Sequence, residues 1–289
     1  MPSVINTNLA SLNAQRNTST SQMSLAVSMQ RLSSGLRVNS AKDDAAGLAI
    51  AERMNAQVKG MNVAIRNAND GISLAQTAEG ALSKVGDALQ RMRELGVQAR
   101  NATNTDADKD SLDKEFAELA KEIQRVMAGT TFNGKAILSG ASGTQTFQVG
   151  ANVTANDTID ITTSNMTTAT EVTTVAGTDN TGAGRSKIDN TADATAIATV
   201  ITNIDAALDK VNSERATMGA AQNRFDAVIG NLQVSVENQS ASKSRIMDAD
   251  FASETANLSR SQILQQAGTA MISQANQLPQ QVLTLLRGG

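Results

Sequence analysis

Apolar residues recur every three or four positions over most of this 289-residue chain, the spacing of one face of an α-helix. Each row is narrow and lies near the 3.5-residue period of a coiled coil. Only Pro2 and Pro279 could interrupt a helix, so long helices are expected. The clearest rows lie in residues 72–99, 106–127, 192–239 and 263–286.

The N-terminal end carries a weaker row of the same kind. Gly35 follows this row, and because glycine adopts the left-handed conformation that ends helices, we expect the helix to stop there. A matching row lies near the C-terminus. We expect the two rows to pair with each other and then to bury themselves against neighbouring copies. The candidate assembly residues are Ile5, Leu9, Leu12, Met23, Val27, Ile263, Met271, Leu278, Val282 and Leu285.

The pattern changes to strict alternation in the middle of the chain. Residues 144–149 and 158–162 alternate apolar and polar side chains, which predicts a β-hairpin. Residues 163–190 are rich in Thr, Ser, Gly, Asn and Asp and are expected to form a loop with little to bury. The predicted fold is mainly α: an elongated antiparallel helical bundle or coiled coil with a small β-hairpin and paired terminal helices.

The amino-acid composition excludes several kinds of catalytic and metal site. The chain has no His and no Cys, which rules out His or Cys zinc ligands, Cys nucleophiles and Ser-His-Asp relays. A net charge of −3 gives no sign of the basic surface that binds nucleic acids. The longest apolar stretch, near Ala45–Ala51, is far too short to span a bilayer. No basic segment followed by an apolar one marks a Sec-type signal. We expect no catalytic, cofactor or metal site, and no membrane insertion.

Two stretches imitate known motifs without completing them. Gly129–Lys135 nearly matches a P-loop, but Ala136 follows where Ser or Thr must hold Mg²⁺, so a turn is the better interpretation. Asp106, Asp108 and Asp110 have the spacing of the first ligands of a calcium-binding loop, but the Gly and the bidentate Glu that such a loop requires are missing. An acidic helix start explains these aspartates better, because the helix dipole favours negative charge there.

Charge is distributed unevenly. All 28 acidic residues lie between Asp43 and Glu254, so residues 1–42 and 255–289 carry only cations. In a stack of identical helices every charge repeats, so acid-free, Gln- and Asn-rich ends suit a core made of many copies. Chance clustering of charge and a pair of disordered tails are the alternatives, and the regular apolar row near the C-terminus argues against the tails.

Several stretches resemble bacterial flagellin. Near the N-terminus these are Met1–Asn8, Arg31–Ile50 and Gln90–Gln98. Near the C-terminus they are Ser244–Phe251, Gln262–Gly268 and Gln274–Leu283.

The resemblance implies a non-enzymatic subunit of the extracellular flagellar filament, which polymerises with itself for motility. Residues 1–42 with 255–289 would form the inner tube, and residues 43–162 with 191–254 the surrounding wall. Residues 163–190 would be a short variable loop in place of outer domains. The resemblance also implies export in the unfolded state through the flagellar type III channel. An export chaperone, the filament cap and hook-junction proteins are then expected partners.

The resemblance further implies that host Toll-like receptor 5 recognises the monomer. The positions that it carries over are Gln90, Arg91, Leu95, Gln98 and Glu115. We expect Leu95 to be an apolar residue on a polar helix face beside Arg91, an arrangement typical of a binding hot spot. The same row could instead pack against a neighbouring subunit.

Three other classes of protein share some of these features. A hook–filament junction protein has similar ends, but the residues from Ser34 to Ile50 and from Gln90 to Gln98 are closer to flagellin. A secreted coiled-coil effector or adhesin would leave both assembly ends unexplained. A flagellin carrying a protease would need a metal-binding insert, which the absence of His excludes.

Overall fold

The computed structural model describes residues 7–140 and 143–287, with side chains described as far as Gln277 in the last helix. The chain forms two compact units. The terminal unit contains residues 1–56 and 237–289, and the central unit contains residues 57–236. Each unit is described separately below.

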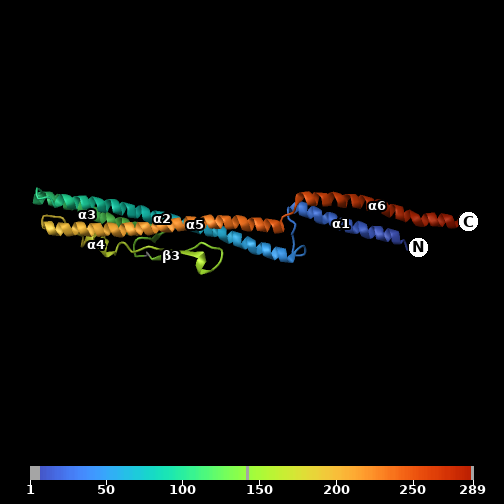
Figure 1. Ribbon diagram of the computed structural model, residues 1–289, viewed down its shortest axis with the longest axis horizontal. Helices are drawn as coiled ribbons and strands as arrows, with labels where there is room; N and C mark the ends of the chain where they lie inside the picture. The colour runs from blue at the N-terminus through green and yellow to red at the C-terminus, as the bar shows by residue number, and fades with distance from the viewer. Residues whose placement is uncertain (1–6, 141–142, 288–289) are drawn as a thin grey trace. The chain divides into compact units, whose positions relative to one another are not determined.

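The terminal unit is built on α1 (Leu9–Ser34) and α6 (Phe251–Arg287), which lie side by side and antiparallel (Figure 1). The amide of Asn8 donates to the carbonyl of Ala275 at 2.7 Å. At the other end of the pair, Ser28 Oγ donates to Glu254 at 3.0 Å. The predicted pairing of the terminal helices is therefore confirmed for the described residues.

Local sequence explains where α1 begins and ends. The Asn8 side chain caps the helix by accepting from the Ser11 N–H at 3.1 Å. Gly35 ends it in the left-handed conformation, with φ of +71°, as predicted. The chain then runs beside the connection between α5 and α6, where Leu36 forms a β-bridge with Asp248.

Two very long helices run through the central unit, α2 (Ala45–Ala99) and α5 (Ala194–Met247), and both also contribute to the terminal unit. In the central unit they are antiparallel. Glu79 pairs with Arg215 at 2.8 Å, and Arg93 further along α2 pairs with Asp205, earlier in α5, at 2.7 Å. Both helices extend beyond the rows that predicted them, because residues with weaker apolar spacing continue the same hydrogen bonding.

A third helix, α3 (Asp106–Gly129), begins as the sequence predicted. Thr105 caps it and accepts from the Asp108 N–H, while the Asp108 carboxylate accepts from Thr105 at 2.7 Å. The reciprocal bonds form a capping box. These hydrogen bonds also explain why the Asp108 pKa is lowered: the Thr105 hydroxyl and the Thr105 N–H both favour the charged carboxylate. The aspartates that imitate a calcium loop are a helix start.

Short antiparallel strands follow α3. Asn133 and Gly134 form a tight turn, both with positive φ, where the sequence imitates a P-loop. The predicted larger hairpin is confirmed, with Phe147 opposite Ile159. Phe147 also meets the Phe225 ring of α5 edge to face, with ring centres 5.5 Å apart. The elements are β1 (Thr131–Phe132), β2 (Lys135–Ala136), β3 (Thr144–Gln148), the 3₁₀ turn η1 (Ala155–Asp157) and β4 (Thr158–Thr162).

The expectation that residues 163–190 bury little is wrong. They contain a short helix, α4 (Thr170–Ala176), whose Val172 and Val175 are fully buried. Ile188 is fully buried as well. The few apolar residues of this polar segment fall at the spacing that one helical turn brings to one face, which composition alone does not reveal.

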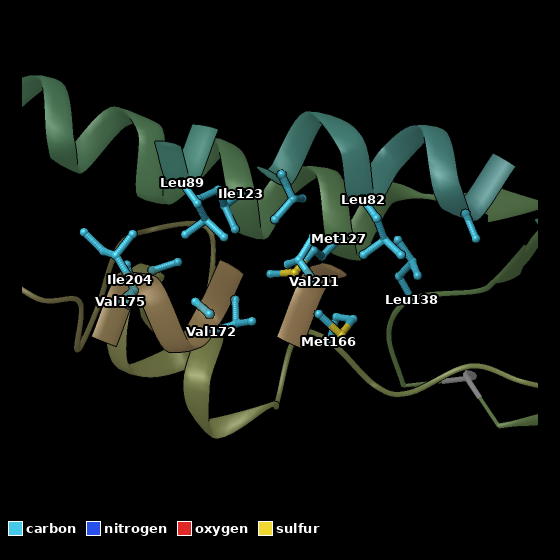
Figure 2. Close-up of a cluster of buried hydrophobic side chains, with 14 of the residues drawn as sticks. Leu82, Leu89, Ile123, Met127, Leu138, Met166, Val172, Val175, Ile204 and Val211 are labelled. Atoms are coloured by element: carbon cyan, nitrogen blue, oxygen red, sulfur yellow. The ribbon is translucent and has the colours of Figure 1, made fainter. Parts of the chain in front are cut away.

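The core of the central unit is shared by α2, α3, α4 and α5. Figure 2 shows Leu82 and Leu89 of α2 gathered with Ile123 of α3, Val172 of α4 and Ile204 of α5. The predicted interior row of α2, including Val85 and Met92, is buried. The mainly α fold class with a small antiparallel hairpin is confirmed.

Candidate assembly and recognition surfaces

The contact between α1 and α6 is made of small side chains. On α1 the covered residues repeat with a seven-residue period: Ser11, Ala14, Thr18, Ser21, Leu25, Ser28 and Leu32. On α6 the corresponding residues are Glu254, Leu258, Ser261, Gln265, Gly268, Ile272 and Ala275. The period is that of a coiled coil, but most of these positions hold Ser, Thr, Ala or Gly in place of large apolar residues.

Gly268 shows how close the helices come. A Cβ atom at this position would lie 2.5 Å from Thr18 Oγ1. Only glycine fits there without a shift of the hydroxyl group. Small seam residues therefore let the two backbones approach closely at this point, although Leu25, Leu32, Leu258 and Ile272 also lie in the seam.

The predicted assembly residues with described side chains are exposed. Their exposed fractions run from 43% for Val27 to 66% for Leu9, with Leu12 at 47% and Ile263 at 65%. The expectation that Leu9 and Leu12 pair with α6 inside one subunit is therefore wrong. Small residues occupy the seam, and the apolar row faces away from it.

Part of the predicted set cannot be placed. Ile5 lies outside the described residues. Leu278, Val282 and Leu285 lie within α6, but their side chains are beyond the described part of the chain. Structure adds members that the apolar row missed, because they stand beside it: Met29, Phe251 and Leu264 are each more than half exposed.

We use the term outward apolar face for the exposed apolar side chains of α1 and α6. Its members are Leu9, Leu12, Met23, Val27, Met29, Phe251, Ile263, Leu264 and Met271. A groove along the pair is lined by three of these residues, Met23, Val27 and Leu264, and otherwise by polar side chains such as Ser24 and Arg260. Nine of the exposed large apolar side chains in the described part of the chain lie on this one pair of helices, and such a concentration indicates an interaction site.

The single carboxylate of the helix pair is neutralised internally. Glu254 is the only acidic residue of α1 and α6, and it is 7% exposed. It accepts from Arg31 Nη1 at 2.8 Å and from Ser28. Arg16 and Arg260 are exposed and have no ion-pair partner among the described residues. The outward surface of the pair is thus apolar and cationic.

A second surface lies on α2 and α3 of the central unit. The Arg91 guanidinium bridges two carboxylates, Glu94 Oε2 at 2.9 Å and Glu115 Oε1 at 2.9 Å. The hydrogen bonds that Arg91 donates to these two carboxylates, Glu94 first, raise the pKa of its guanidinium. Gln90 and Gln98 are exposed on the same helix. Four of the five predicted receptor positions therefore lie on the surface.

Leu95, the fifth position, is fully buried, so its predicted place on the polar face is wrong. It lies four residues after Arg91, but it joins the core row of Met92 and Ala99. The exposed apolar residue of this face is Val97, at 54%. Leu95 can be assigned to the interior from sequence only when the apolar spacing is followed from Met92 through Leu95 to Ala99.

No group of His, Cys, Asp or Glu among the described residues could hold a metal ion. No helix in the described chain is long and apolar enough to cross a membrane.

Comparisons with known proteins agree with this architecture. Residues 5–143 match the family described as "Bacterial flagellin N-terminal helical region", and residues 201–286 match "Bacterial flagellin C-terminal helical region". The chain is 44% identical to a flagellin of Halalkalibacterium halodurans over 98% of this chain and 100% of that one. It is 40% identical to a flagellin of Bacillus subtilis over 98% and 99% of the two chains.

One solved structure supports the fold alone. A putative flagellar hook-associated protein of Vibrio parahaemolyticus is 14% identical, with a TM-score of 0.59, and covers 71% of this chain and 100% of its own. The family matches at both ends and the full-length relatives identify the chain. It belongs to the bacterial flagellins, the non-enzymatic structural subunits of the extracellular flagellar filament.

Proposed function

We propose that this flagellin polymerises through the outward apolar face of its terminal helix pair. The observation that carries the proposal is the burial pattern of α1 and α6. The seam of the pair consists mostly of small residues with a few leucines, while Leu9, Leu12 and Ile263 remain exposed. Neighbouring copies that cover these side chains would gain roughly 25 cal/mol for each Å² of apolar surface removed from water.

In this proposal residues 1–42 and 255–289 form the inner tube of the filament, and residues 43–162 with 191–254 form its wall. The cationic character of the pair supports a packed core without unpaired carboxylates. Glu254, the one acid present, already has Arg31 as its partner within the same subunit. Repetition of the subunit therefore adds no unpaired negative charge to the core.

Truncation tests this proposal. Removal of residues 1–35 or 262–289 should leave a monomer that keeps the central unit but forms no filaments. Electron microscopy and sedimentation after addition of a precipitating salt would measure assembly, and circular dichroism would confirm the remaining helix. Long filaments from either truncation would contradict the proposal.

We also propose that the chain leaves the cell unfolded through the flagellar type III channel, aided by an export chaperone. Completion of the filament would then involve the cap and hook-junction proteins. The absence of Cys supports the export route, because no disulfide can block unfolding. Inactivation of the export apparatus in a flagellated host should trap the chain inside cells. Its continued appearance in the medium would exclude this route.

A further proposal is that Toll-like receptor 5 of a host recognises the monomer through Arg91 and Glu115. Their ion pair holds the guanidinium in one position on an exposed surface flanked by Gln90 and Gln98. Arg is frequent among residues that dominate binding energy. Because Leu95 is buried, its contribution would be to support the surface from below.

Receptor-expressing reporter cells treated with purified monomer test this recognition. Arg91→Ala and Glu115→Ala should each reduce activation. Arg125→Ala, which removes another exposed ion-paired arginine on α3, is the matched control and should leave activation unchanged. Full activation by an Arg91→Ala/Glu115→Ala double variant would exclude recognition at this site.

A further inference from the structure

Methionine is the only sulfur-containing residue in this chain. Cys, Trp, Tyr and His are all absent, whereas Met occurs 11 times. Peroxide therefore finds its readily oxidised side chains among the methionines. Reversible oxidation of this subunit by peroxide therefore involves its methionines.

The methionines fall into two groups by exposure. Met23, Met29 and Met271 are 61%, 55% and 62% exposed. Of the others with described side chains, Met54 is half-buried and the rest are buried. The buried ones are Met61, Met92, Met127, Met166, Met218 and Met247.

All three exposed methionines belong to the outward apolar face. Met23 and Met29 stand on α1, and Met271 stands on α6. Met23 also lines the groove beside Val27 and Leu264. The side chains that peroxide reaches first are thus the side chains that a neighbouring copy would cover.

We propose that Met23, Met29 and Met271 form a reversible oxidation site that controls whether a free subunit can polymerise. The proposal rests on assembly through the outward apolar face. In the reaction, a lone pair on the thioether sulfur attacks one peroxide oxygen, an S–O bond forms and the O–O bond breaks. The hydroxysulfonium that forms passes its proton to the released hydroxide, which gives the sulfoxide and water: sulfur is oxidised by two electrons and peroxide is reduced.

Oxidation changes the character of the face. A sulfoxide is a strong hydrogen-bond acceptor, and covering it without a donor is unfavourable. Near Met23 the groove offers Arg260 and several hydroxyls, but a sulfoxide covered by an apolar side chain of a neighbouring copy would have no donor. We expect full oxidation of the three residues to raise the monomer concentration needed for polymerisation about fivefold or more. A methionine sulfoxide reductase should reverse the effect.

The test treats full-length monomer with hydrogen peroxide and follows each methionine by peptide mass spectrometry. Met23, Met29 and Met271 should gain one oxygen well before Met92, Met127 and Met218. Oxidised monomer should then polymerise poorly and recover after reductase treatment. In assembled filaments the same three methionines should be protected.

Two variants complete the experiment. A Met23→Leu/Met29→Leu/Met271→Leu variant has side chains of similar size and apolarity that peroxide does not oxidise, so its critical concentration should be the same before and after peroxide, whatever its value. A Met166→Leu/Met218→Leu variant keeps the exposed site, so peroxide should impair it like the wild type.

The outcomes separate this inference from the assembly proposal. Normal polymerisation of wild-type monomer whose three exposed methionines are fully oxidised would overturn the oxidation site and leave assembly through the face intact. Equal loss of polymerisation by the triple-Leu variant after peroxide would also overturn it. If the untreated triple-Leu variant and the wild type both fail to polymerise, the assembly proposal falls, and this inference falls with it.

Discussion

An ion pair between Asp113 and Arg185 attaches residues 163–190 to α3. Arg185 donates to Asp113 through Nη1 at 2.9 Å and Nη2 at 2.5 Å, and the Ile188 N–H donates to the same carboxylate at 3.0 Å. Both side chains are nearly covered, at 13% and 12% exposed. Asp113 of α3 thus binds the segment that follows α4 at two points.

Replacing Asp113 with Ala leaves a buried guanidinium without a counter-charge and a buried N–H without an acceptor. Loss of one partner from a buried pair costs about 3–5 kcal/mol. We expect Asp113→Ala to lower the free energy of unfolding by an amount in this range. Urea titration of the monomer, followed by circular dichroism, measures the change.

A control on the same helix separates this effect from loss of any carboxylate. Glu118 pairs with Lys121 at 2.7 Å, but its side chain is 73% exposed. Glu118→Ala should therefore change stability by less than about 1 kcal/mol. In a double-mutant cycle, Asp113→Ala and Arg185→Ala should show strong coupling. A loss no larger than that of Glu118→Ala, or additive effects of the two substitutions, would refute the reasoning.

Three further predictions follow from other contacts. Gly268→Leu should separate α1 from α6, because even a Cβ atom there would lie 2.5 Å from Thr18 Oγ1, and electron microscopy should show loss of filaments from a folded monomer. Val97→Ala should weaken receptor activation several-fold. The control, Val63→Ala, removes a 44% exposed valine from the same helix and should not weaken activation. Equal effects of the two substitutions would exclude a specific contact at Val97. Burial raises the pKa of Asp113, but the hydrogen bonds from Arg185 and from the Ile188 N–H outweigh burial and lower the pKa overall. The stabilising effect of the charged carboxylate should therefore be lost as pH falls below the ordinary value of 3.8. An acid titration of wild type against Asp113→Asn checks the sign, since the variant should lose less stability over that range.

The long helices and the larger hairpin could be predicted from sequence because their signals are periodic and extend over many residues. The interior row of α2 and the capping of α1 by Gly35 are local features that follow from residue type and spacing. Thr105 and Asp108 likewise mark the start of α3 without knowledge of the fold. For these elements local preference and tertiary structure agree.

Three features depend on information that periodicity does not contain. An apolar row indicates that a helix has an apolar face, but it does not show which partner covers that face. The expected contact between Leu9 and α6 is therefore wrong. Leu95 lies at the margin of two rows, and only packing against the core decides its side. Residues 163–190 are polar on average, but Arg185 finds its partner at Asp113, far away in the sequence. Shortening this segment should therefore disturb the central unit, contrary to expectation from composition.

The central claim is that exposed apolar residues of α1 and α6 drive polymerisation, and the critical concentration of point variants tests it most directly. Ile263 is 65% exposed on α6, and Val234, at 58%, is an exposed apolar residue of the central unit. Covering Ile263 in a filament should contribute on the order of 1–2 kcal/mol, so Ile263→Ser should raise the critical concentration roughly 5- to 30-fold. Val234→Ser should leave it nearly unchanged, with both monomers folded. An unchanged critical concentration for Ile263→Ser, or equal increases for the two variants, would contradict the account.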